Sequence, residues 1–180
     1  AEASAVSSKI AILLIIRTEN TVSALAKPRN LSNLPGTHFT SALMEHVLVI
    51  PRSLFDQLGS FQGFQPDADR YLHAILAPGA NFFMERPAAE QDPTHKQLIP
   101  YAIFHHNGRY LCYTRGGASG EKRLVAKRSI GIGGHINPVD QAHDGLGETL
   151  YFNGVEREIA EELRIGGTHT QTVIGLINDD

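Results

Sequence analysis

Three glutamates in the C-terminal part of the sequence have a spacing that suits metal binding. Glu158, Glu161 and Glu162 fall at positions i, i+3 and i+4 of a predicted helix, so their carboxylates share one face. Three like charges this close repel one another, and a bound Mg²⁺ or Mn²⁺ would reverse the sign of that interaction, because carboxylate oxygens are ligands for hard cations. The alternative is a solvated acidic face, partly balanced by Arg157 and Arg164. The three glutamates alone favour that simpler alternative, so the context has to decide.

Two glycines and three basic residues precede this helix. Gly133-Gly134 ends a predicted strand, and glycines at such a place let a backbone carbonyl approach a metal ion or a phosphate closely. The basic residues of the preceding strand, Arg123, Lys127 and Arg128, are candidates for binding substrate phosphates. A solvent-facing strand edge explains each of them equally well.

The surrounding elements predict a mixed α/β domain. The expected elements are strands over 98–105, 109–114, 123–132 and 172–177 and a helix over about 149–164. His106-Asn107-Gly108 favours a hairpin turn between the first two strands, because Asn-Gly readily adopts positive φ angles. Val155, Ile159 and Leu163 recur every four residues and give the helix one apolar stripe, and Gly166-Gly167 is expected to end it.

The sequence indicates one core with additional N-terminal sequence. Residues 1–43 are rich in Ser, Ala, Thr, Asn and Leu without a clear period, and we expect them to be an extension, or upstream sequence read through, rather than part of the catalytic domain. Residues 44–96 contain a helix candidate at 53–58 and an apolar patch at 71–76, and they are predicted to form an N-terminal lobe or connector. Residues 97–180 are the predicted catalytic core.

Composition excludes several classes of partner. The net charge of −3 and the pI near 6.3 provide no general basic field for nucleic acid. The apolar run Ile10–Ile16 is far shorter than the roughly 20 residues that span a membrane.

Cys112 is the only cysteine, which indicates a reducing, cytoplasmic location, and we expect it to be a core residue of a strand. The nine histidines show no zinc-binding spacing, and the oligomeric state stays open, a homodimer included.

The stretch from Gly133 to Ile165 resembles the Nudix box, usually written G-x5-E-x7-R-E-U-x-E-E-x-G-U with U an aliphatic residue. The C-terminal half of the motif matches at Arg157, Glu158, Ile159, Glu161, Glu162 and Ile165. The loop half is longer than usual. The sixth residue after Gly134 is Asp140, with sixteen residues between it and Arg157, whereas an alternative register takes Glu148 as the motif's acid. Arg164 stands where the motif has its last glycine.

This resemblance, which covers residues 98–180, implies an α+β fold, a Nudix-type α/β/α sandwich with a mixed sheet. It implies a hydrolase that uses Mg²⁺ or Mn²⁺ to cleave a diphosphate linkage in a small nucleoside diphosphate derivative. The family fold continues with another strand and a second helix, so we expect part of it to lie beyond Asp180.

The resemblance also implies a role for each matching residue. Arg157 would orient the glutamates through the loop acid, which is Asp140 or Glu148, and Glu161 would be either a further metal ligand or a base acting through water. The implied metal ligands are Glu158, Glu162, Glu161 and a backbone carbonyl of Gly133 or Gly134.

Two other functions remain as alternatives. A Nudix-like domain that binds a nucleotide without cleaving it would need no glutamate triad, although the stretched loop and Arg164 are compatible with such a sensor. The isoprenoid diphosphate isomerases share the architecture but need an acid-base cysteine, for which Cys112 is the sole candidate. The intact triad therefore favours the hydrolase.

Overall fold

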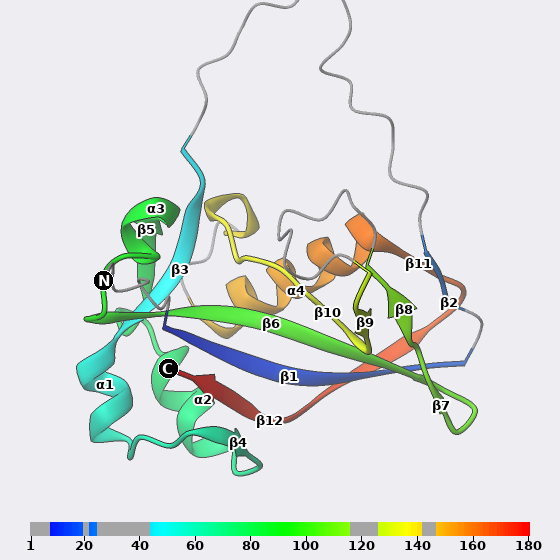
Figure 1. Cartoon of the computed structure of the whole chain (residues 1–180), viewed down its shortest axis with the longest axis horizontal. Helices are drawn as coiled ribbons and strands as arrows, with labels where there is room; N and C mark the ends of the chain where they lie inside the picture. Colours follow the sequence, from blue (N-terminus) through cyan, green and yellow to red (C-terminus); the bar gives the residue numbers. More distant parts are fainter. Residues whose placement is uncertain (1–7, 20–21, 25–43, 116–125, 142–146) are drawn as a thin grey trace, which may run out of the picture.

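A computed structural model describes residues 8–19, 22–24, 44–115, 126–141 and 147–180. Its centre is an eight-stranded mixed sheet with the order β4-β12-β1-β6-β3-β5, to which β7 and β10 add by pairing with β6 (Figure 1). The strands of this sheet are β1 (Lys9–Thr18), β3 (His46–Pro51), β4 (Gly63–Gln65), β5 (Phe82–Glu85), β6 (His95–His106), β7 (Arg109–Tyr110), β10 (Gly131–Gly133) and β12 (His169–Asp179).

Two short ribbons and five helical segments complete the described chain. The ribbons pair β2 (Val22–Ala24) with β11 (Leu163–Ile165), and β8 (Tyr113–Thr114) with β9 (Arg128–Ser129). The helices are α1 (Arg52–Gln57), α2 (Asp69–Ile75), α3 (Arg86–Ala89) and α4 (Glu148–Glu162), with a 3-10 helix at Pro138–Asp140. Among the described residues, none of the helices has the length and apolar character needed to cross a bilayer.

Strand β1 lies in the middle of the sheet. It runs parallel to β6, with Ile10 opposite Leu98, and antiparallel to β12, with Ile12 opposite Leu176. The prediction that residues 1–43 lie outside the catalytic domain is therefore wrong for Lys9–Thr18, while residues 25–43 lie outside the described part. The error has a physical reason: a central strand is apolar on both faces and lacks the alternation that marks a half-buried strand.

Residues 44–96 belong to the same sheet rather than to a separate lobe. Strand β3 pairs with β6 on one side and with β5 on the other. The expected helix at 53–58 is α1, and the apolar patch at 71–76 is most of α2. The predicted lobe thus supplies both outer strands of the sheet order, β4 and β5, as well as β3 and three helices that pack on the sheet.

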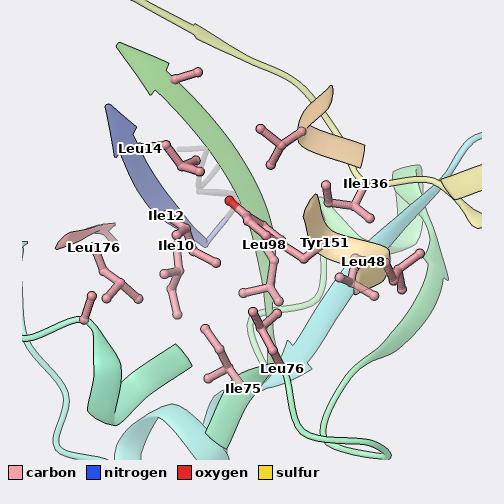
Figure 2. Packing of buried hydrophobic residues seen from close by; sticks show 14 of the residues in the cluster. Ile10, Ile12, Leu14, Leu48, Ile75, Leu76, Leu98, Ile136, Tyr151 and Leu176 are labelled. Atoms are coloured by element: carbon pink, nitrogen blue, oxygen red, sulfur yellow. The ribbon is translucent and has the colours of Figure 1, made fainter. Parts of the chain in front are cut away.

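Helices cover both faces of the sheet to different extents. Helices α1, α2 and α4 contribute to one apolar cluster with the inward-facing residues of β1, β3, β6 and β12 (Figure 2). Within it, Tyr151 of α4 and Ile75 of α2 are completely buried. The short helix α3 packs on the other face at the sheet edge, where Ala89 contacts Val47 and Val49. The α+β class with a mixed sheet is confirmed.

One end of the core is closed by a buried lysine. Lys96 has no exposed surface, and its Nζ donates hydrogen bonds to Ser8 Oγ at 2.6 Å and Asn178 Oδ1 at 2.9 Å, and also to Asp180. Burial lowers the pKa of Lys96, and the carboxylate of Asp180 opposes that effect. These contacts fix the ends of β6 and β12 beside the start of β1.

Helix α4 carries the predicted apolar stripe but ends earlier than expected. Val155 and Ile159 are buried on the helix, and Leu163 is buried directly after it. Leu163 has extended backbone angles, φ −132° and ψ 151°, and begins strand β11, which pairs with β2. The helix therefore ends at Glu162 and not at Gly166-Gly167, because backbone pairing with a distant strand replaces its last turn.

The predicted strands around the hairpin are confirmed in part. Asn107 and Gly108 have positive φ angles, 47° and 74°, and turn β6 into β7 as expected. The run 109–114 is not one strand, because β7 and β8 are separated by Leu111 and Cys112. The prediction of Cys112 as a core residue of a strand is wrong, since it lies exposed between the two strands.

Candidate active site on helix α4

Arg157 connects the residues that the sequence singles out. Its Nε and Nη2 donate hydrogen bonds to the two carboxylate oxygens of Asp140, at 2.7 and 3.1 Å. Its Nη1 donates to Oε1 of Glu158 and to Oε1 of Glu161, both at 3.0 Å, and Nη2 also donates to the carbonyl oxygen of His135 at 2.8 Å. The pair with Asp140 is the strongest of these interactions, because two parallel N–H groups of the planar guanidinium bind the two oxygens of one carboxylate.

Asp140, and not Glu148, is the acidic partner of Arg157. The Asp140 side chain is 2% exposed and also accepts a hydrogen bond from the backbone N–H of Asn137 at 2.8 Å. That bond is half of a capping box that rigidifies the 3-10 helix. Glu148 lies exposed in the first turn of α4, nine residues before Arg157, which is about 13 Å along a helix.

The carboxylate of Glu158 lies half-buried against the glycine pair. Its Oε1 accepts hydrogen bonds from Arg157 and from the backbone N–H of His135, the latter at 3.2 Å. Burial raises the pKa of Glu158, and the neighbouring Arg157 only partly offsets that effect. A Cβ atom added at Gly134 would overlap the Glu158 carboxylate, so glycine is needed there for the approach.

We expect Gly134→Ala to displace Glu158 and to destabilise the fold by about 1–3 kcal/mol, because the added methyl group overlaps a half-buried side chain. Urea denaturation of four proteins, the wild type, Gly134→Ala, Glu158→Ala and the double variant, measures this effect. In the Glu158→Ala background the glycine substitution should be nearly neutral. An equal cost in both backgrounds would show that the contact with Glu158 is not the reason for the glycine.

The other two glutamates differ in accessibility. Glu161 is 59% exposed and is bonded by Arg157, while Glu162 is half-buried at the last position of α4. Among the described residues, no three acidic, histidine or cysteine side chains are gathered into a metal-binding group. The side chains are nevertheless of the right chemical type for a divalent cation, because carboxylates are hard oxygen ligands. The absence of a Cβ atom at Gly134 leaves the space in which the Glu158 carboxylate lies.

The predicted phosphate-binding residues are only partly described. Lys127 and Arg128 are exposed just before β10, Arg128 in strand β9, and no hydrogen bond or ion pair of the described chain joins either side chain to the glutamates of α4. Arg123 lies outside the described residues. Gly133 ends β10 next to Gly134, and Gly134 lies against the Glu158 carboxylate in space.

His135 is a site residue that the sequence prediction missed. Its backbone N–H and its carbonyl hold Glu158 and Arg157, respectively, so its main chain joins the loop to α4. Burial lowers the pKa of its ring to about 4. The sequence pointed to His135 only by its position directly after Gly133-Gly134. Because it acts through its main chain, the identity of its side chain does not reveal this role.

Comparison with known proteins supports a relationship over most of the chain. No protein-family model matches it. Protein YmaB of Bacillus subtilis (strain 168) is 37% identical over 141 residues, which cover 76% of this chain and 68% of YmaB. The crystal structure of Tm1382, a candidate Nudix hydrolase, aligns with a TM-score of 0.53 at 32% identity, covering 65% of this chain and 57% of Tm1382.

This chain thus spans less than two thirds of Tm1382. The aligned fold agrees with the mixed sheet and the few helices described above. With fold, relatives and local geometry in agreement, the chain belongs to the Nudix hydrolase family.

Proposed function

We propose that this protein is a metal-dependent hydrolase that cleaves the diphosphate linkage of a small nucleoside diphosphate derivative. The observation that carries the proposal is the contact set of Arg157, which holds Asp140, Glu158 and Glu161 at once. A solvated acidic face would need no such arrangement, because exposed ion pairs contribute little to stability. Fixed carboxylates beside a glycine-lined approach are what a catalytic metal site requires.

The proposed division of roles follows from burial and charge. Glu158 and Glu162 would be the main metal ligands, completed by a carbonyl of Gly133 or Gly134. Glu161 is the most accessible of the three and is suited to be a further ligand or to accept a proton from the attacking water. When bound, Mg²⁺ or Mn²⁺ would neutralise diphosphate charge and lower the pKa of a water molecule.

Arg157 is a positioning residue in this proposal. Its hydrogen bond to Asp140 is the first cause that raises its pKa, so the guanidinium stays charged at any physiological pH. It is therefore a permanent cation that fixes Glu158 and Glu161 relative to the loop. Lys127 and Arg128, both exposed, remain candidates for binding the substrate phosphates.

A nucleotide-binding domain without turnover is the second candidate. Two observations favour it. In the described residues no three potential ligands are gathered, and Arg157 occupies Oε1 of both Glu158 and Glu161. In that case Arg157 would stabilise the acidic face permanently, and the ligand would bind elsewhere on the domain.

A panel of nucleoside diphosphate derivatives, incubated with Mg²⁺, Mn²⁺ or EDTA, separates the two candidates. We expect metal-dependent release of phosphorylated products by the wild type, and a loss of this activity by orders of magnitude in Glu162→Gln, since one metal ligand is removed. Equal activity in both proteins would exclude the assigned site. Binding without turnover under every condition would favour the sensor.

A further inference from the structure

A hollow at the β6–β7 turn has the size and lining of a ligand site. Its volume is about 510 Å³, within the range of small-molecule sites. Val22, Phe104 and Leu111 provide apolar surface, and the turn residues provide polar groups. Among the described residues, those that line it are Val22, Phe104, His106, Asn107, Arg109, Tyr110 and Leu111.

The hollow lies next to the end of α4 that carries Glu162. Gly154 lies against Ile136 and Glu158 lies beside Gly134, so α4 runs alongside the segment that follows β10. Towards the end of α4, Ile159 belongs to the same buried cluster as Ile132, which pairs with Ala102 of β6. The next residue of β6 on that face is Phe104, which lines the hollow.

Strand β2 reaches the same place from the other side. Val22 pairs with Ile165, three residues after Glu162, and Val22 also lines the hollow. Figure 1 shows β2, β11 and the β6–β7 turn at the same end of the molecule. The hollow therefore lies near the end of α4, where β11 follows Glu162.

Arg109 is the residue of the hollow best suited to bind an anion. The ring of His106 is engaged at both nitrogens, Nδ1 with the carbonyl of Thr18 at 2.9 Å and Nε2 with Asn107 Nδ2 at 3.0 Å. Arg109 stands opposite His106 in the β6–β7 pair and is exposed. Within the described part of the chain it forms no ion pair, so its guanidinium is available to an oxyanion.

We propose that this hollow binds the part of the substrate that lies away from the scissile diphosphate, with Arg109 binding a phosphate monoester or carboxylate on that part. The apolar floor at Phe104, Leu111 and Val22 would accommodate the carbon skeleton that carries the anion. This inference rests on the proposed function, and it narrows the substrate to diphosphate compounds with an additional negative charge on the distal half.

Two pairs of compounds test the inference, because each pair differs by one anionic group. NADPH and NADH differ by a phosphate monoester, and UDP-glucuronate and UDP-glucose differ by a carboxylate. Binding of all four to the full chain is measured by calorimetry in EDTA, for the wild type, Arg109→Gln and Arg70→Gln. Arg70 lies on α2 over the ring of Tyr71 and provides a control with the same change of charge.

We expect the wild type to bind the more anionic member of one pair roughly tenfold to a hundredfold more tightly, the effect of a charged hydrogen bond. Arg109→Gln should remove this preference and Arg70→Gln should keep it, and the pair that responds identifies phosphate or carboxylate. Equal binding within both pairs, no binding, or a preference that survives Arg109→Gln would overturn the inference. A preference without hydrolysis of any of the four in Mg²⁺ would retain the hollow and contradict the proposed function.

Discussion

Replacing Glu158 with Gln should lower kcat by on the order of a hundredfold to a thousandfold, because it removes a proposed metal ligand while keeping the shape of the side chain. The amide still accepts a hydrogen bond from Arg157 or His135, so the fold should be retained. Steady-state hydrolysis of the best substrate from the panel, measured at saturating Mg²⁺ or Mn²⁺, gives the result.

Glu156→Gln is the matched control for this substitution. Glu156 lies on the same helix but is exposed and contacts His169, with 3.1 Å between Oε1 and the ring nitrogen Nε2. Its replacement changes the net charge equally and should leave kcat within about twofold, since a surface ion pair has little energetic weight. A similar fall in both variants would mean that the charge of α4, and not a ligand at Glu158, supports the activity.

Breaking the Arg157–Asp140 pair should have the largest effect on stability. Arg157→Met leaves the buried Asp140 carboxylate without its cation, and we expect a cost of about 3 kcal/mol in the free energy of unfolding. Activity should fall roughly tenfold to a hundredfold, because the glutamates lose the group that positions them. Urea denaturation and hydrolysis kinetics measure the two effects separately.

A double-mutant cycle with Asp140→Asn shows whether the two residues act as a pair. The double variant should cost clearly less than the sum of the single variants, with a coupling of about 1–3 kcal/mol. Glu148→Gln is the control, because it alters the rival acid of the motif, which lies exposed in the first turn of α4. Additive costs, or a loss of activity in Glu148→Gln as large as in Asp140→Asn, would contradict the assignment.

The helix that carries the proposed site was predictable because its signals are local. Helical periodicity places Val155 and Ile159 in the core and leaves the glutamates on an adjacent face, and the structure keeps both features. The β6–β7 turn was predictable for the same reason, since Asn107-Gly108 determines its own backbone angles. The residues that determine each of these elements lie close to one another in the sequence.

The errors at β1 and at the end of α4 involve partners that are distant in sequence. Strand β1 is assigned to the sheet by pairing with β6 and β12, which lie more than 80 residues away. The end of α4 is determined by β2 in the same manner, so a local prediction extends the helix too far. Burial of Asp140 distinguishes it from Glu148, and no spacing rule contains that information.

The most direct test of the proposed metal site is a Mn²⁺ titration of the full chain, followed by the electron paramagnetic resonance signal of free Mn²⁺. The wild type and Glu156→Gln should bind Mn²⁺ equally, and Glu158→Gln and Glu162→Gln should each bind it at least about tenfold more weakly, since a carboxylate ligand is lost. Unchanged Mn²⁺ affinity in both of these variants would contradict a metal site on helix α4.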